Sequence, residues 1–208
     1  MEQKPHLAHL IHRHRDLETG KEKKYLEERQ DSLAARLRAG NHAAAAELVD
    51  IYHGQIYLYM RRLGHSCQVS EDLTQESFIQ AWQHIGQLRS AKALNSWLYR
   101  IAANVSKRHI RKYRGRKLFS MEAADLPDST EDEYNKVRHL EQVGRLKIAV
   151  ERLPVKLRQV IVLHYMQYLT IAEAAEAAEV TEGTFKSRLN RALKVLRNQI
   201  SSEDGELQ

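Results

Sequence analysis

The chain has 208 residues, a formal net charge of +6 and 42% hydrophobic residues, enough apolar material for one large or two small packed domains. Gly and Pro are scarce, at 9 and 3 residues, which favours an all-helical protein. No apolar run approaches the roughly 20 residues of a membrane span, the N-terminus lacks the apolar core of a secretory signal, and Cys67 is alone. A lone cysteine excludes an intrachain disulfide and a cysteine-rich zinc site, so we expect a cytoplasmic protein.

The positive charge is concentrated in one block. Residues 30–117 hold 14 basic and 6 acidic residues, a net charge of +8, whereas residues 118–139 hold 2 basic and 6 acidic residues, a net charge of −4. A block of one sign indicates a partner, here one that carries phosphate, and does not indicate a particular fold.

The first half of the chain predicts four helices. One begins at Asp31 and ends at Gly40, and a second begins after Asn41 and ends at Gly64. Ser70 is a candidate N-cap for the third, and Ser96 can open a fourth that reaches Arg111 or beyond. Helical spacing predicts the core residues of the second and fourth helices: Leu48, Ile51, Tyr52, Ile56, Tyr59 and Leu63, then Trp97, Leu98, Ile101 and Val105.

Residues 118–137 predict an acidic linker, because they have no sustained period and contain Pro127. A helix is then expected from about Lys136 to Arg152, and after Pro154 the segment VKLRQVIVLHYMQ predicts another. Residues 201–208 are expected to be a frayed tail.

The segment from Thr170 to Ile200 has the pattern of a helix-turn-helix, whose second helix enters the DNA major groove. The turn lacks the usual Gly, so Glu179 or its neighbour must take that position, and Thr181 is a candidate N-cap. A solvated surface helix with a basic outer face is the alternative. The expected apolar stripes are Ile171, Ala174, Ala175 and Ala178 in the first helix, and Phe185, Leu189, Leu193 and Leu196 in the second.

Three stretches in this order resemble one family: EDLTQESFIQAW (71–82), LNSWLYRIAANVSKRHIRKYRGRK (94–117), and a long segment that begins LPVKLRQVIVLHYMQ and ends LNRALKVLR (153–197). Together they resemble bacterial extracytoplasmic-function (ECF, group IV) RNA polymerase sigma factors. The resemblance implies two small helical domains, sigma region 2 at 30–117 and sigma region 4 at 138–200. They are joined by the linker, and an N-terminal extension, residues 1–29, lies outside the resemblance.

The resemblance also implies a function. The protein would bind core RNA polymerase, recognise the minus-35 and minus-10 promoter elements and help to melt the latter. An anti-sigma factor would control it. We expect no catalytic residues, no cofactor, no small-molecule substrate and no membrane insertion. A stand-alone helix-turn-helix regulator is the alternative, although it would leave EDLTQESFIQAW unexplained.

By resemblance, the third helix docks on the largest subunit of the polymerase. Its surface stripe supplies the candidates, and an acidic and polar patch in a basic domain fits a basic protein partner. These candidates are Asp72, Gln75, Glu76 and Ile79.

The minus-10 candidates follow in the chain. By resemblance, the segment IGQLRSAKA (85–93) captures a flipped base, although many relatives have an aromatic residue where Leu88 stands. Basic side chains beyond it would follow phosphates, with binding that weakens in salt. The candidates are Leu88, Arg89, Ser90, Tyr99, Arg100, Asn104, Lys107, Arg108, Arg111 and Lys112, and the basic run continues through Arg114, Arg116 and Lys117.

The minus-35 candidates lie on the second helix of the helix-turn-helix. Arg and Lys suit guanine, Asn suits adenine, and phosphate contacts would hold the helix in place. The candidates are Thr184, Lys186, Ser187, Arg188, Asn190 and Arg191.

The N-terminal extension is His-rich. We interpret it as a polar arm without a metal, and binding of zinc, nickel or copper by His6, His9 and His12 is the alternative. The acidic linker is interpreted as a tether, and mimicry of nucleic-acid charge within the polymerase is a further hypothesis.

Overall fold

The computed structural model describes residues 20–113 and 146–205, with side chains for residues 28–113 and 146–199. Within these residues the secondary structure is helical and contains no strand, which confirms the predicted all-α class. The histidines of the extension, the acidic linker and the basic residues Arg114, Arg116 and Lys117 lie outside the described residues. The N-terminal elements are α2 (Gly20–Arg38), α3 (His42–Arg62), α4 (Cys67–Gln83), the short 3-10 helices η2 (Ile85–Gln87) and η3 (Ala91–Ala93), and α5 (Leu94–Tyr113).

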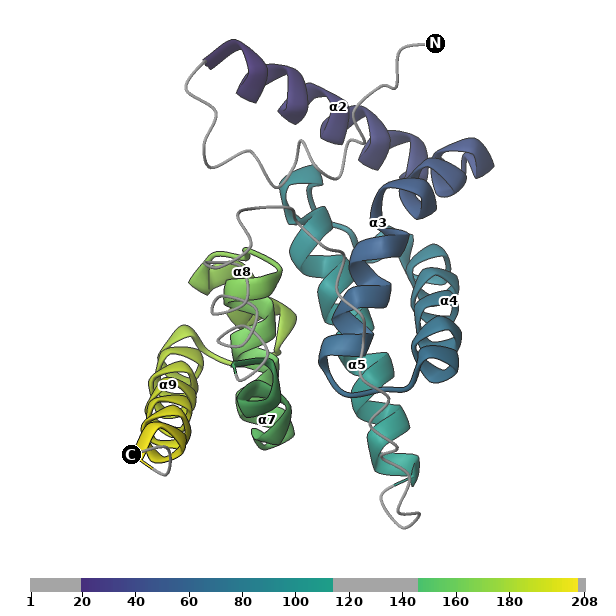
Figure 1. Ribbon diagram of the computed structural model, residues 1–208. Helices are drawn as coiled ribbons and strands as arrows, with labels where there is room; N and C mark the ends of the chain where they lie inside the picture. The colour runs from purple at the N-terminus through teal and green to yellow at the C-terminus, as the bar shows by residue number, and fades with distance from the viewer. Residues whose placement is uncertain (1–19, 114–145, 206–208) are drawn as a thin grey trace, which may run out of the picture.

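The N-terminal domain is a bundle of α3, α4 and α5, with α2 lying across one end (Figure 1). The predicted apolar stripe of α3 is buried over its whole length, from Leu48 to Leu63. In α5, Trp97, Leu98 and Val105 are buried as predicted, and Ile101 packs partly buried against the core. Tyr59 and Tyr99 meet edge to face with ring centroids 5.4 Å apart, a favoured geometry for buried aromatic pairs.

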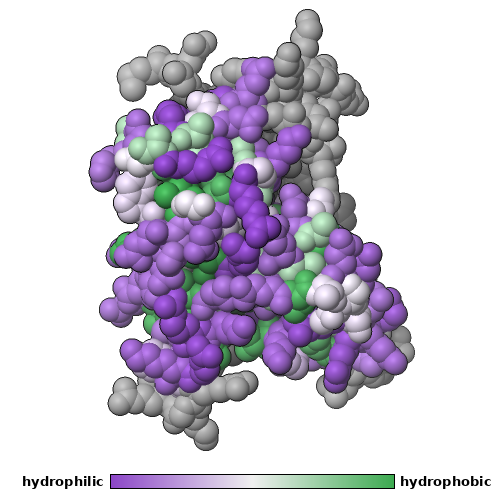
Figure 2. Space-filling model, turned by 180° about the vertical axis from the view of Figure 1, so that it is seen from behind, coloured by the Kyte–Doolittle hydropathy of each residue, from purple (hydrophilic) through white to green (hydrophobic). Residues whose placement is uncertain are grey.

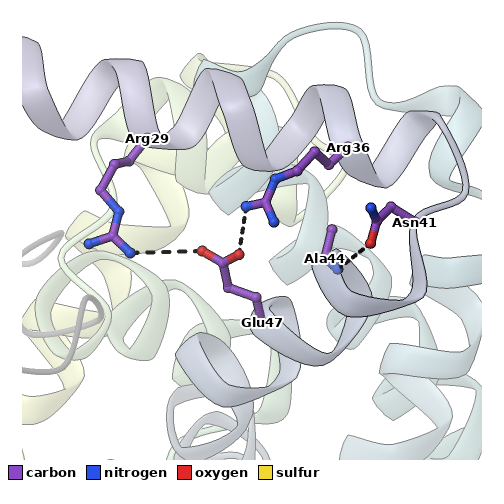
Figure 3. A network of polar contacts seen from close by, with 5 residues as sticks. All are labelled: Arg29, Arg36, Asn41, Ala44 and Glu47. Carbon is purple, nitrogen blue, oxygen red and sulfur yellow. Dashed lines mark hydrogen bonds and ion pairs between the residues drawn. The ribbon is translucent and has the colours of Figure 1, made fainter.

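Polar contacts fix the start of α3 beneath α2 (Figure 3). Asn41 caps α3 as predicted, because its side chain accepts a hydrogen bond from the Ala44 amide at 3.1 Å. The carboxylate of Glu47 lies between two arginines of α2, with Arg36 at 2.6 Å and Arg29 at 3.8 Å. These side chains are partly exposed, so the network orients α2 on α3 and adds little stability.

Three predicted helix starts are wrong. The first helix begins at Gly20, well before Asp31. The third begins at Cys67, capped by Ser66, because Ser70 is buried inside the helix and donates to the His65 carbonyl. The fourth begins at Leu94, directly after η3, so its core-facing turn starts before Ser96. The predicted ends at Gly40 and Gly64 are confirmed, since both glycines adopt positive φ, at 73° and 96°.

The C-terminal domain contains a helical segment over residues 146–152, α7 (Val155–Ile161), the π-helical turn η4 (Val162–Met166), α8 (Ile171–Ala177) and α9 (Glu182–Gly205). Pro154 separates the first two as predicted. The segment expected to form one helix after Pro154 changes to π-helical geometry at Val162. Helix α9 continues to Gly205, past the point where we expected the tail. None of the described helices has the length and apolar character needed to cross a membrane.

The two domains pack against each other, with α7, α8 and α9 on one side of the N-terminal bundle (Figure 1). Helix α8 lies along α5, and η4 contacts α3. Seen from behind, the surface is mostly hydrophilic, and apolar residues show in narrow strips between polar ones (Figure 2).

Candidate nucleic-acid and polymerase interface

The exposed side of α4 carries the predicted polymerase-binding residues. Asp72, Gln75 and Ile79 are exposed, and Ile79 is 58% exposed although it is a large apolar side chain. Glu76 is half-buried and forms an ion pair with Arg108 of α5 at 3.4 Å. The opposite side of α4 is held in the bundle by the buried Leu73 and by two aromatic side chains that pack partly buried against the core, Phe78 and Trp82. The arrangement leaves Asp72, Gln75 and Ile79 open on the surface, with Glu76 beside them held by Arg108.

The turn between α8 and α9 has helix-turn-helix geometry. The capping box of Thr170 and Glu173 begins α8, and the Thr181 hydroxyl accepts from the Thr184 amide at 3.2 Å to begin α9, as predicted. Between them Glu179 adopts φ 55°, the left-handed region normally taken by Gly, as the missing glycine led us to expect. A non-glycine residue in this conformation costs about 1 kcal/mol relative to glycine.

Helix α9 presents the predicted minus-35 residues on its outer side. Its inner side is anchored by Phe185, Leu189 and Leu196, which are buried, and by Leu193, which is partly buried. Lys186 pairs with Glu182 one turn earlier at 3.3 Å, and Arg188 is half-buried at the edge of the face. The remaining candidates are exposed: Thr184, Ser187, Asn190 and Arg191.

The predicted minus-10 residues fall into two groups on α5. Lys107, Arg108, Arg111 and Lys112 are exposed and form a basic end of the helix that is open to solvent. Nearer the start of the helix, Arg100 is half-buried and the other two candidates face the C-terminal domain. They are Tyr99, which is 0% exposed, and Asn104, whose amide donates to Glu179 at 3.0 Å.

The loop before α5 is similarly divided. Arg89 and Ser90 are exposed, and the Ser90 hydroxyl accepts from the Ala93 amide at 3.3 Å to cap η3. Leu88 is 2% exposed, and α2 packs over η2 and η3, which flank it. Its expected contact with a base stays a prediction, and the loop would have to move for Leu88 to reach DNA.

A buried histidine supports the junction of α3, α4 and α5. His65 shares a hydrogen bond with Ser106 at 2.8 Å, and its ring meets His109 edge to face at 5.3 Å. Burial, and then the neighbouring His109 and Arg158, lower the pKa of His65 to about 4. His65 is therefore neutral at physiological pH. Among the described residues, no three His, Cys, Asp or Glu side chains come together as a metal site.

Sequence reasoning missed the residues that join the two domains. Arg62 donates to the Met166 carbonyl at 2.9 Å, and Arg158 donates to the Leu63 carbonyl at 2.8 Å. Both acceptors lie at the ends of helices, where carbonyls lack partners within the helix. No local sequence signal marks such contacts, because they depend on how the two domains meet.

Both halves of the chain match known families, which defines it as a two-domain sigma-70-type protein. Residues 48–116 match Sigma-70 region 2, and residues 145–196 match Sigma-70, region 4. The structure resembles that of CnrH in complex with the cytosolic domain of CnrY, with a TM-score of 0.62, 23% identity, and coverage of 83% of this chain and 98% of that one. It also resembles the sigma factor RpoE of Bartonella quintana in complex with the anti-sigma factor NepR, with a TM-score of 0.61, 22% identity, and coverage of 75% and 96%. At these identities the likeness establishes the fold.

Curated relatives define the family more closely. The chain is 32% identical over 180 residues to the ECF RNA polymerase sigma factor SigW of Bacillus subtilis, covering 79% of this chain and 93% of the relative. It is 30% identical over 168 residues to the ECF RNA polymerase sigma factor SigM of Mycobacterium tuberculosis, covering 79% and 82%. The chain belongs to the ECF RNA polymerase sigma factors.

Proposed function

We propose that this chain acts in the cytoplasm as a group IV sigma factor that directs core RNA polymerase to promoters. The exposed stripe of α4 binds the polymerase, α9 reads the minus-35 element, and α5 with its preceding loop binds the minus-10 strand. The observation that carries the proposal is the joint presence of the α4 stripe and the exposed polar side of α9 on one chain. A stand-alone regulator needs only the second of these features.

The chemistry of each surface supports its assigned partner. Asn190 and Arg191 are exposed on the outer side of α9, in its third turn, and both side chains suit base edges in a major groove. The basic end of α5 suits a phosphate backbone, so its contribution should decline as salt rises. The protein contributes binding and positioning, while the catalytic chemistry of transcription belongs to the polymerase.

We further propose control by an anti-sigma factor. Support comes from the resemblance to RpoE, whose structure was determined with the anti-sigma factor NepR. The exposed Ile79 of α4 offers an apolar contact for such a partner as well as for the polymerase. Competition for α4 would then keep the sigma factor from the polymerase.

Run-off transcription tests the main proposal. The purified protein is mixed with bacterial core polymerase and a library of promoter-like templates, alongside a Gln75→Ala plus Glu76→Ala variant. The matched control, Gln30→Ala plus Asp31→Ala, likewise removes one amide and one carboxylate side chain, here from α2. We expect specific transcripts from wild type and control and none from the α4 variant. Specific binding of the protein alone to duplex DNA without any transcript would instead favour the stand-alone regulator.

A further inference from the structure

Side-chain hydrogen bonds join α5 to the C-terminal domain, and among the described residues α5 supplies the donor in the following three. Ser96 Oγ donates to Glu176 Oε2 at 2.8 Å, and Asn104 Nδ2 donates to Glu179 Oε1 at 3.0 Å. Tyr99 OH donates to Gln167 Oε1 at 2.6 Å and also lies 3.4 Å from Gln55 Oε1 of its own domain. Tyr99 and Asn104 are among the residues proposed to meet the minus-10 strand, so the C-terminal domain occupies their polar groups.

The backbone conformation of Glu179 indicates that its bond to Asn104 is important. Glycine would fit the left-handed turn between α8 and α9 without strain, yet the chain has Glu there at φ 55°. Its carboxylate reaches across to Asn104 of the other domain. Backbone strain that persists beside a specific contact suggests that the side chain has a function.

Two arginines also join the two domains. Arg62 of the first domain donates to a helix-end carbonyl of the second, and Arg158 of the second donates to a helix-end carbonyl of the first. Burial lowers the pKa of both guanidinium groups, although both remain charged at physiological pH. The reciprocal pair therefore joins the end of α3 to η4 and to α7.

A polar group at the interface is left without a partner among the described residues. Gln167 is 3% exposed and its Nε2 has no hydrogen-bond partner among the described residues. A buried donor without a partner weakens the closed arrangement relative to a fully paired one. The Asn104 and Glu179 side chains are exposed or half-buried, so water can compete for their bond.

From these contacts we propose that the free protein inhibits itself: the C-terminal domain closes on α5, and Gln167 and Glu179 occupy the hydrogen-bond donors of Tyr99 and Asn104 that single-stranded minus-10 DNA would need. Glu176 helps to hold the closed form through its bond to Ser96. The proposal rests on the proposed role of α5 in binding that strand. Helix α9 keeps its polar side exposed in the closed form. Duplex minus-35 DNA can therefore bind without opening, whereas capture of the minus-10 strand requires the domains to separate.

Closure is tested first by NMR on the full chain, without DNA. Asn104→Ala on α5 should shift the backbone amide signals of Glu179 and its neighbours in the turn, because the Glu179 side chain reaches Asn104 only if the domains close in solution. Lys107→Ala is the matched control on the same helix, at an exposed position, and should leave those signals unchanged. Unshifted signals in the Asn104→Ala variant would overturn the closed form, whatever the DNA measurements give.

Masking is tested by fluorescence anisotropy with a labelled single strand that carries the non-template minus-10 sequence of a promoter mapped by run-off transcription. The variant is Glu176→Gln plus Glu179→Gly, which should fold because glycine suits the turn. Asp31→Asn plus Asp50→Asn makes the same change in charge at exposed positions and serves as control. We expect the variant to bind about tenfold more tightly than wild type or more, because apparent affinity rises with the open fraction.

The outcomes separate the two proposals. The Glu176→Gln plus Glu179→Gly variant is called the latch variant, and Asp31→Asn plus Asp50→Asn the charge control. If both bind the single strand with equal affinity, the masking proposal is overturned. Duplex minus-35 DNA should bind the latch variant and the charge control with equal affinity. If the latch variant alone binds the duplex more tightly, by as much as it does the single strand, the masking proposal is also overturned. If the wild-type protein supports no transcription at all, the proposed function fails and the masking role fails with it. The NMR comparison would still report whether the domains close.

Discussion

The two helices proposed to bind DNA, α5 and α9, differ in what faces solvent. Helix α9 buries one apolar side and leaves its polar side open, from Thr184 to Arg191. Helix α5 is buried on two sides for its first turns, against its own bundle and against α8, and only its basic end is open. A helix that reads duplex DNA can be ready in the free protein, whereas a surface for unpaired bases gains from being covered until a melted strand is available.

The largest expected effect concerns the anchor of α9. Phe185→Ala should lower the free energy of unfolding by about 3–5 kcal/mol, because Phe185 is 0% exposed and its removal leaves a cavity. Urea denaturation followed by circular dichroism measures this loss. The neighbouring exposed change Lys186→Ala should stay within about 0.5 kcal/mol of wild type. Similar losses for both variants would mean that Phe185 is not the anchor.

Acid should lower the stability of the N-terminal bundle, which holds α5 and His65, more than that of the domain that holds α9. The pKa of His65, about 4 in the folded state, lies below its ordinary value of 6.5, so the unfolded chain binds the proton more tightly. The stability that this neutral histidine contributes is complete above pH 6.5 and is lost as the pH falls to about 4, by up to about 3 kcal/mol. Denaturation across this pH range should show a shallower decline for His65→Gln. The exposed control His84→Gln should keep the wild-type decline, and an unchanged slope in His65→Gln would refute the assignment.

A smaller effect is expected at the open side of α9. Asn190→Ala or Arg191→Ala should weaken binding of a minus-35 duplex by about 1–3 kcal/mol each and relax sequence preference at one position. Anisotropy with the mapped promoter and single-base variants of it measures both effects. Arg197→Ala, exposed further along the helix, is the control and should act evenly on all sequences. Loss of affinity without loss of preference would assign Asn190 and Arg191 to phosphates.

The smallest effect should come from the ion pair between Glu76 and Arg108. Both side chains are close to half exposed, so Glu76→Ala should change the unfolding free energy by less than about 1 kcal/mol. The Gln75→Ala plus Glu76→Ala variant should nevertheless abolish transcription. If Glu76→Ala misfolds, the loss of transcription would reflect misfolding and could not be assigned to a lost contact with the polymerase.

The sequence predicted most of what depends on local pattern. The apolar stripes of α3 and α9 repeat at helical spacing, and each is buried or packed against the core where the spacing placed it. Glu179 or its neighbour was expected in the glycine position of the turn, and the positive φ of Glu179 shows which of the two takes it. Helix starts were harder, because Ser66 and Ser70 have the same capping chemistry and only burial distinguishes them.

The contacts between domains were beyond sequence reasoning. Ser96, Gln167 and Glu176 are common polar residues in unremarkable surroundings, and their pairing depends on a meeting of segments about 70 to 80 residues apart. Tyr99 shows the difficulty well. The resemblance assigned it a DNA-facing role, whereas in the structure it is 0% exposed: its ring packs against Tyr59 of its own bundle, and its hydroxyl donates to Gln167 of the second domain. Its role toward DNA, like those of the other site residues, stays a prediction.

The reciprocal arginines have a consequence for exchange of domains between relatives. Because Arg62 and Arg158 each serve a carbonyl of the opposite domain, the two halves carry matching parts of one junction. A chimera that joins this N-terminal domain to a foreign C-terminal domain without an arginine at position 158 would keep one of the two contacts. Such hybrids should still recognise the minus-10 element of one parent and the minus-35 element of the other. They should, however, lose the domain orientation that brings Glu179 onto Asn104. The two arginines therefore limit which pairs of domains can form a chimera that keeps this contact.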